Sequence, residues 1–220
     1  MMNLNAGHDP EGVIKFNCLH ADGPLPTEDG LPQLLAWRRI LHGLGLIGQT
    51  PERYDGYGFG NISVRAGESG FLITGTQTGA PPELTPQQCV MVTAWDTRRN
   101  EIRAQGPVRP SSESMTHSVL YELDPSLGCV MHAHCPDIWH KGEALGLPAT
   151  RSEVPYGTPE MADEVRRLWR ETDASSRGVF IMAGHEDGVV SCGADAMTAG
   201  NILIDHLARA YALEHQETRR

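Results

Sequence analysis

Four short runs rich in β-branched and apolar residues follow one another in the first half of the chain, and they restrict the fold more than any other feature. They occupy residues 60–65, 71–74, 89–94 and 101–103. Turn-forming residues separate them, as at 67–70 and 96–100. Consecutive strands joined in this way pair in antiparallel order. The sequence therefore predicts an antiparallel meander.

Helical patterns and further strands surround this meander. Proline and serine at 110–112 predict a helix entry capped by serine, with Glu113 in the first turn and Pro125 after the end. Thr158 and Pro159 predict a second capped entry. A final helix over 194–215 is expected to turn Met197, Ile204, Leu207 and Tyr211 inward. The remaining expected elements are a helix at 30–46 and strands at 129–134, 178–183 and 189–192.

The order of these elements favours one fold class. Strands and helices do not alternate regularly, which indicates α+β or layered α/β/α packing around a mainly antiparallel sheet. A doubly wound nucleotide fold is disfavoured because GxGxxG and GxxxxGK[ST] are both missing. The 220 residues are 40% apolar without a spacer rich in Pro, Ser or Gly. We expect a single domain over residues 1–220, with residues 1–30 as an N-terminal extension.

Charge and cysteine usage restrict the partners and the compartment. A formal net charge of −10 disfavours nucleic acid and anionic membranes, so a small-molecule partner is expected. The chain contains no apolar stretch of membrane-spanning length and no signal-peptide pattern at its start. Its five cysteines are scattered without a CxxC pair, which favours reduced thiols. These features predict a cytoplasmic protein.

Histidines supply a candidate metal site. His132 and His134 alternate with Ala133 in a predicted strand, so both imidazoles point to the same face. His185 lies where a strand breaks into a turn, from which a third imidazole can reach the same ion. Three imidazoles leave a coordination position open, as in catalytic zinc sites. An HxH pair also occurs by chance, and buried histidines often only hydrogen-bond to a neighbour.

Two segments are candidates for binding an anion. Ser111 and Ser112 offer hydroxyls and backbone N–H groups at a predicted helix start, although an ordinary cap accounts for them equally well. The glycine-rich loop at 74–79 can form a nest of amides, or it can be a plain hairpin turn. Glu113 on its own is a capping-turn carboxylate. His117, one helical turn further on, is expected either to serve in packing or to orient a ligand or this carboxylate.

Taken together, these motifs resemble the class II aldolase/adducin family. The resemblance covers residues 60–200 and rests on order and spacing, with PSSE followed after 18 intervening residues by HxH. The motifs are Gly60-Asn61, the TGTQTG loop at 74–79, Leu84-Thr85, Pro110-Ser-Ser-Glu113, His132-Ala-His134 and Gly184-His185. Each motif alone is weak, whereas the series in this order is specific.

The resemblance implies a three-layer α/β/α fold, a homotetramer with sites between subunits, and a bound zinc ion, with manganese or cobalt as substitutes. By matching position, His132, His134 and His185 would be ligands. Glu113 would be a fourth ligand that moves away as the catalytic acid/base. The family's sugar-phosphate aldolases hold phosphate at positions matching Gly60, Asn61, Thr78, Gly79, Ser111 and Ser112. One extra residue in the loop leaves Thr76 as an alternative to Thr78.

The same resemblance leaves several reactions open. Aldol cleavage of a small, sugar-phosphate-like hydroxyketone is the first expectation, because the phosphate-site serines and Asn61 are retained. A dehydratase, decarboxylase or epimerase is the rival, with Arg151 pairing to a substrate carboxylate. A metal-free scaffold like the adducins is a third reading. The tyrosine that those aldolases use as an acid has no direct match, and Tyr156 is the candidate substitute.

Overall fold

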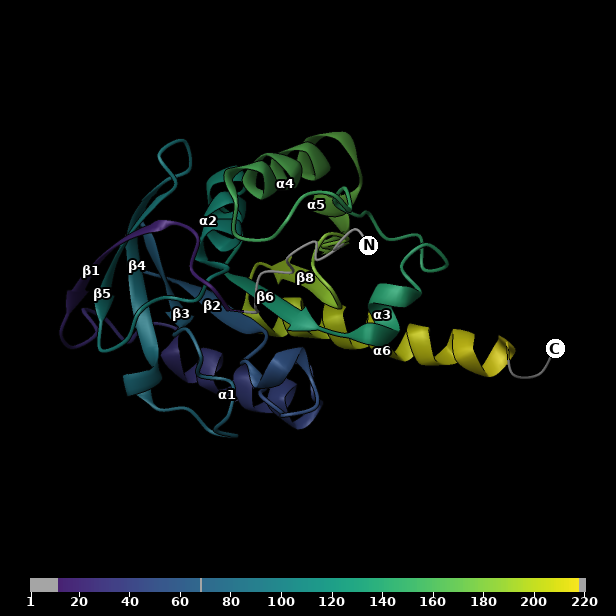
Figure 1. Ribbon diagram of the computed structural model, residues 1–220, viewed down its shortest axis with the longest axis horizontal. Helices are drawn as coiled ribbons and strands as arrows, with labels where there is room; N and C mark the ends of the chain where they lie inside the picture. Colours follow the sequence, from purple (N-terminus) through teal and green to yellow (C-terminus); the bar gives the residue numbers. More distant parts are fainter. Residues whose placement is uncertain (1–11, 68, 218–220) are drawn as a thin grey trace, which may run out of the picture.

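A computed structural model describes residues 12–67 and 69–217, and a single eight-stranded sheet runs through it (Figure 1). The strand order is β1-β5-β4-β3-β2-β6-β8-β7. Every neighbouring pair is antiparallel except β1 and β5, which are parallel. The strands are β1 Asn17–Asp22, β2 Asn61–Ala66, β3 Gly70–Thr74, β4 Cys89–Asp96, β5 Glu101–Gly106, β6 Cys129–His134, β7 Val179–Ile181 and β8 Gly188–Gly193. The expected mainly antiparallel sheet is confirmed.

The predicted meander corresponds to β2, β3, β4 and β5, which pair in sequence order. Strand β1 was not predicted, and it lies within the segment expected to be an N-terminal extension. Its residues are mostly exposed, so they lack the alternation of buried and exposed positions that identifies a strand. Pairing with β5 decides its conformation. Residues 1–11 of the predicted extension lie outside the described part of the chain.

Helices cover both faces of the sheet, which gives the expected three layers (Figure 1). One face packs against α1 Leu31–Gly43, α3 Pro136–His140 and α6 Ala196–Glu217. The other face packs against α2 Ser114–Leu123, α4 Pro159–Glu171 and α5 Ala174–Arg177. Two short 3-10 turns, η1 Tyr54–Gly56 and η2 Pro86–Gln88, precede β2 and β4. Within the described ranges, no helix has the length and apolar character needed to cross a membrane.

Some predicted helix details are confirmed. Thr158 caps α4 by accepting a hydrogen bond from the backbone N–H of Met161 at 3.2 Å. Met161, Val165 and Leu168 form the buried face of this helix. The five cysteines, Cys18, Cys89, Cys129, Cys135 and Cys192, are free thiols, in agreement with the absence of paired spacing.

Two helix predictions were wrong. The helix after Pro110 begins at Ser114, with Glu113 in the cap position and outside the first turn. The extra residues form a turn because Ser111 accepts a hydrogen bond from the N–H of Glu113, an alternative to helical bonding. In α6, Leu207 is buried as expected and Ile204 is half-buried, but Met197 and Tyr211 are exposed, at 62% and 47%. The buried face consists of Ala196, Ala199, Leu203, Leu207 and Ala210, because small residues let the helix lie close to the sheet.

Candidate metal centre

The β6 strand presents two histidines to the layer that contains α2. Val130 packs in the core on this face, and Met131 and Ala133 pack on the opposite one. Since side chains alternate along a strand, His132 and His134 share the face of Val130. Both imidazoles are fully buried. The predicted pairing of two imidazoles on one face is therefore present.

A turn between β7 and β8 supplies the third imidazole. Backbone bonds from His185 N–H to Met182 O, 3.0 Å, and from Gly188 N–H to His185 O, 2.9 Å, close this turn. Gly184 is required there, because a Cβ at this position would lie 2.1 Å from the carbonyl oxygen of Val154. The ring of His185 lies 5.0 Å from that of His132 and 4.7 Å from that of His134, measured between centroids.

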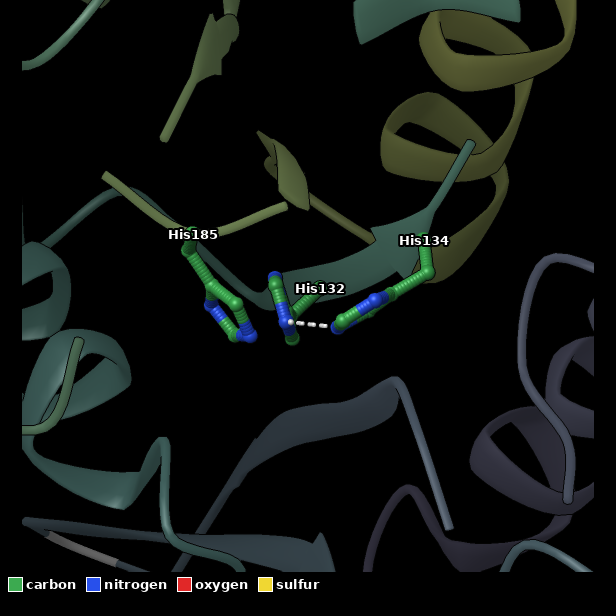
Figure 2. Close-up of side chains that lie close together, drawn as sticks. All are labelled: His132, His134 and His185. Atoms are coloured by element: carbon green, nitrogen blue, oxygen red, sulfur yellow. Dashed lines mark hydrogen bonds between the residues drawn. The ribbon is translucent and has the colours of Figure 1, made fainter. Parts of the chain in front are cut away.

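The three histidines fit a metal ion by distance and by protonation state. One nitrogen from each ring lies within 4.8 Å of the others, and the three rings converge (Figure 2). The Nε2 atoms of His132 and His134 are 3.1 Å apart, near the roughly 3.3–3.4 Å separating two nitrogens on a tetrahedral zinc ion. Burial, followed by the proximity of His185, lowers the pKa of both these imidazoles well below its ordinary value. Neutral imidazoles keep the lone pairs that a metal needs.

Glu113 lies beside this cluster and is almost completely buried, with 1% exposure. Its Oε2 accepts a hydrogen bond from Thr116 Oγ1 at 2.8 Å. Its Oε1 is 3.9 Å from Nδ1 of His185. The carboxylate is therefore held at its Oε2 and lies close enough to the cluster to act on a ligand bound there.

The six residues expected at a phosphate site line one small pocket. They are Gly60, Asn61, Thr78, Gly79, Ser111 and Ser112. Gly12, Gly58, Gly75, Thr76 and Gln77 complete the lining, so both candidate threonines contribute. Asn61 is the ladder partner of His132, and Ser112 precedes Glu113 in the chain. The pocket thus adjoins the histidine cluster.

Backbone groups form much of this pocket's wall. Gly60 has φ +71°, and a Cβ there would lie 2.8 Å from Ile47 Cγ1. A Cβ on Gly79 would lie 2.1 Å from Gly48 O. The side-chain oxygen of Asn61 is buried without a hydrogen-bond partner among the described residues, which marks a place where a ligand or water is expected. The pocket suits a small polar ligand that bonds to backbone amides.

Tyr156 and Lys15 also lie at the site, and only Tyr156 had been considered. The Tyr156 ring stacks on the His185 ring with centroids 4.4 Å apart. The Lys15 Nζ atom lies 4.1 Å from the centroid of the Tyr156 ring and donates a hydrogen bond to its backbone oxygen at 3.2 Å. No periodicity marks Lys15, because it comes from the irregular segment before β1.

A second group that the sequence analysis missed surrounds His134. Tyr54 contacts the His134 ring edge-on at 4.6 Å and donates a hydrogen bond to Asp187 Oδ2 at 2.6 Å. Arg53 donates to the Tyr54 oxygen at 2.8 Å and to His134 O at 3.1 Å. Tyr54 and Asp187 have φ of 50° and 61°, a strained conformation for non-glycine residues. These bonds join the segment before β2 to the turn that carries His185.

Arg151 has a different role from the one considered. Its Nη1 donates to Glu164 Oε1 at 2.9 Å, and its backbone N–H donates to Glu164 Oε2 at 3.1 Å. Arg167 also bonds to Glu164, at 2.8 Å, and this hydrogen bond is the main reason that the Glu164 pKa is lowered. Arg151 thus holds the 151–158 loop to α4. Because its guanidinium is already paired with Glu164, the case that it binds a substrate carboxylate is weaker.

His117 lies behind the site, and its titration gives a testable prediction. Its Nδ1 is 2.7 Å from Ser63 Oγ, and burial lowers its pKa to about 3. In the unfolded chain the pKa of His117 is about 6.5, so between that pH and about 3 the unfolded state binds a proton at His117 that the folded state does not. The free energy of unfolding that depends on the neutral imidazole is therefore complete above a pH of about 6.5 and is lost as the pH falls toward 3. For metal-free protein, His117→Gln should reduce the slope of unfolding free energy between pH 6 and 4 by about 1.4 kcal/mol per pH unit.

Denaturant unfolding at a series of pH values measures this slope. His215→Gln, at an exposed position on the last turn of α6, serves as the control. An unchanged slope in His117→Gln would contradict the assignment of a neutral buried imidazole.

Fold and site define the class of protein: a three-layer α/β/α chain whose three-histidine cluster fits a metal ion beside a buried carboxylate. The sequence-family model described as the class II aldolase and adducin N-terminal domain matches residues 51–212. The chain therefore belongs to this family.

Solved structures confirm the fold. The L-fuculose-1-phosphate aldolase from Thermus thermophilus has a TM-score of 0.62 at 20% identity, over 85% of this chain and 93% of that one. A sugar-phosphate aldolase from Thermotoga maritima has a TM-score of 0.65 at 17% identity, over 87% and 96%. At these identities the likeness shows the fold alone.

Curated sequence relatives carry a different name. A methylthioribulose-1-phosphate dehydratase from Leptospira biflexa is 28% identical over 127 residues, which are 57% of this chain and 59% of that protein. One from Stenotrophomonas maltophilia is 50% identical over 30 residues, 14% of each chain. Each match spans less than two thirds of the relative's length.

Proposed function

We propose that the chain is a metal-dependent lyase that acts on a small phosphorylated hydroxyketone. The observation that carries the proposal is the contiguity of three groups: the histidine cluster, the carboxylate of Glu113, and the glycine-walled pocket that begins one residue away at Ser112. A substrate with a phosphate at one end and a carbonyl and hydroxyl near it can span these groups. Zinc is the metal we propose, with manganese or cobalt as substitutes.

The histidines and the pocket bind and orient the substrate. When bound at His132, His134 and His185, the ion would act as a Lewis acid toward the substrate oxygens. The backbone amides and the two serines would hold the phosphate, which fixes the carbon skeleton relative to Glu113. The three histidines and Glu113 are all buried, which excludes water from the site and strengthens each electrostatic interaction there.

Glu113 would move the proton. Its Oε1 lies on the side of His185, and Thr116 fixes its Oε2, so the carboxylate can accept a proton from the carbon or hydroxyl of a substrate held at the cluster. Tyr156 stacks on His185 and is our candidate for returning a proton to the leaving group. Both side chains are buried, which keeps the exchanged proton away from bulk solvent.

The sequence relatives favour loss of water as the reaction. In that case Glu113 takes the proton from the carbon beside the carbonyl, and the hydroxyl on the next carbon leaves as water after protonation. Carbon–carbon cleavage, the first expectation from the sequence, remains the second candidate, because the fold is shared with sugar-phosphate aldolases. There Glu113 takes the proton from the hydroxyl on the second carbon from the carbonyl, and the bond between that carbon and the carbon beside the carbonyl breaks. One fragment leaves as an aldehyde, and the other keeps the electron pair as an enolate, which is then protonated at carbon to give a ketone.

A product screen is expected to separate these reactions. Zinc-loaded and manganese-loaded protein would be incubated with phosphorylated ketoses, among them methylthioribulose 1-phosphate, and with their non-phosphorylated forms. We expect turnover of the phosphorylated ketoses only. The product should be a dicarbonyl compound that keeps all the carbon atoms of the substrate. Mass spectrometry detects the loss of 18 mass units that water elimination gives. Aldehyde release would instead establish aldol cleavage, and no turnover of any phosphorylated ketose would contradict the proposal.

We also propose a cytoplasmic homotetramer with sites at subunit interfaces, built from one domain per chain. The family resemblance supports this assembly. Light scattering on purified protein measures the mass directly against the 24.0 kDa chain.

A further inference from the structure

Arg38 is the most unusual buried residue outside the site. It lies on α1 with 1% exposure, and its guanidinium donates to four backbone carbonyls of a single loop. Nη2 donates to Thr78 O at 3.1 Å and to Gly79 O at 2.8 Å. Nη1 donates to Pro82 O at 3.0 Å and makes a shorter bond to Pro81 O. The residues that it holds include two that line the polar pocket.

The guanidinium carries its charge without a carboxylate partner in the described part of the chain, where its hydrogen bonds all go to carbonyls. Burial lowers its pKa to about 10, so it remains protonated at neutral pH. A buried charge of this kind is normally paired with an opposite charge. Four carbonyl oxygens accept hydrogen bonds from the Nη1 and Nη2 groups of Arg38, but they leave its net positive charge behind the loop.

The peptide between Thr78 and Gly79 connects Arg38 with the pocket. In a trans peptide the C=O of one residue and the N–H of the next point in opposite directions. Because the carbonyl of Thr78 points to Arg38, the N–H of Gly79 points away from Arg38. Gly79 is also one of the residues that line the pocket. Among the described residues, no carbonyl accepts a hydrogen bond from this N–H.

We propose that Arg38 is a positioning residue for anion binding: it fixes the Thr78–Gly79 peptide so that the Gly79 amide faces the pocket, and it places a positive charge behind that peptide. The inference rests on the proposed function, since it concerns the group that would hold the substrate phosphate. It involves a residue on α1 that lies outside the segment matched by the family model.

Binding of inorganic phosphate to zinc-loaded protein tests this inference without catalysis. Hydrogen exchange of the peptide covering residues 75–80 should slow when phosphate is added. Arg38→Gln should raise the Kd for phosphate about tenfold or more, and Arg38→Lys should recover only part of the affinity, because an ammonium lacks the planar fork that reaches four carbonyls. Zinc content should stay unchanged in both variants.

Arg39→Gln is the matched control. Arg39 is the next residue on the same helix, is 69% exposed, and pairs with Glu83 of the same loop region at 3.0 Å. It should leave the Kd unchanged. For turnover, Arg38→Gln should raise KM for a phosphorylated substrate more than it lowers kcat, whereas general destabilisation would lower the active fraction and thus kcat alone.

Each outcome decides the inference. Phosphate binding at full affinity in Arg38→Gln, with slowed exchange at 75–80 retained, would overturn it and leave the proposed lyase function standing. If Arg38→Gln loses phosphate affinity while the unmodified protein shows no lyase activity, the inference is supported and the proposed function is contradicted. If Arg38→Gln does not fold, exchange in the unmodified protein decides: unchanged exchange at 75–80 under saturating phosphate overturns the inference.

Discussion

Glu113→Gln is expected to lower kcat by about 10²–10⁴-fold, the contribution typical of a positioned acid/base group. The replacement keeps the size of the side chain and can still accept a hydrogen bond from Thr116, which now holds Oε2 at 2.8 Å. It removes the basic oxygen that lies 3.9 Å from His185 Nδ1. Metal content should remain that of the unmodified protein, because the three imidazoles are untouched.

Steady-state kinetics together with metal analysis of the same sample provide the measurement. Glu122→Gln, further along α2 with a half-exposed side chain, is the control and should retain kcat. If Glu113→Gln turned over at the unmodified rate, the carboxylate would have no part in proton transfer. If it lost its metal as well as its activity, Glu113 would act mainly as a ligand.

His132→Ala is expected to remove the metal and abolish turnover. Replacing an outer-shell partner of a metal ligand costs 10–100-fold in metal affinity, so losing one of three direct ligands should cost more than about 100-fold. His132 is fully buried on β6, and the cluster found among the described residues consists of His132, His134 and His185. The stabilisation that metal gives to the unmodified protein should disappear too, since metal binding adds to folding free energy.

Elemental analysis and thermal unfolding with and without added zinc give these quantities. His140→Ala, at the exposed end of α3, should keep both metal and stability. An unmodified protein that carries no metal after loading with zinc, manganese and cobalt in turn would contradict the catalytic proposal. That result would favour the metal-free, adducin-like scaffold considered from the sequence.

Sequence patterns predicted the parts of this protein that depend on neighbouring residues. Alternation along 129–134 placed His132 and His134 on one face, and the short β-rich runs predicted the meander. The cap at Thr158 formed as expected. In α6 the pattern misled, because large apolar side chains at Met197 and Tyr211 lie outward while alanines face the sheet.

Residues that depend on distant contacts escaped the sequence analysis. Lys15 precedes β1, yet it reaches the ring of Tyr156. Tyr54 meets Asp187 across 133 positions of the chain. Arg38 is one arginine on an ordinary helix until its four carbonyl partners are known. No local periodicity marks such residues, because what defines them is a contact between segments far apart in the chain.

The sequence by itself determined the strand and helix types, the two histidines of β6, and the family motifs that point to a site. Only the tertiary structure showed that His185, which the family resemblance had named, meets those histidines, that Glu113 sits in a cap instead of a helical turn, and that the six residues named by the resemblance line one pocket. The physical reason is the range of the interactions. Backbone periodicity and capping act within a few residues, whereas a site forms when packing of the sheet and its two helical layers brings separate loops to the same place.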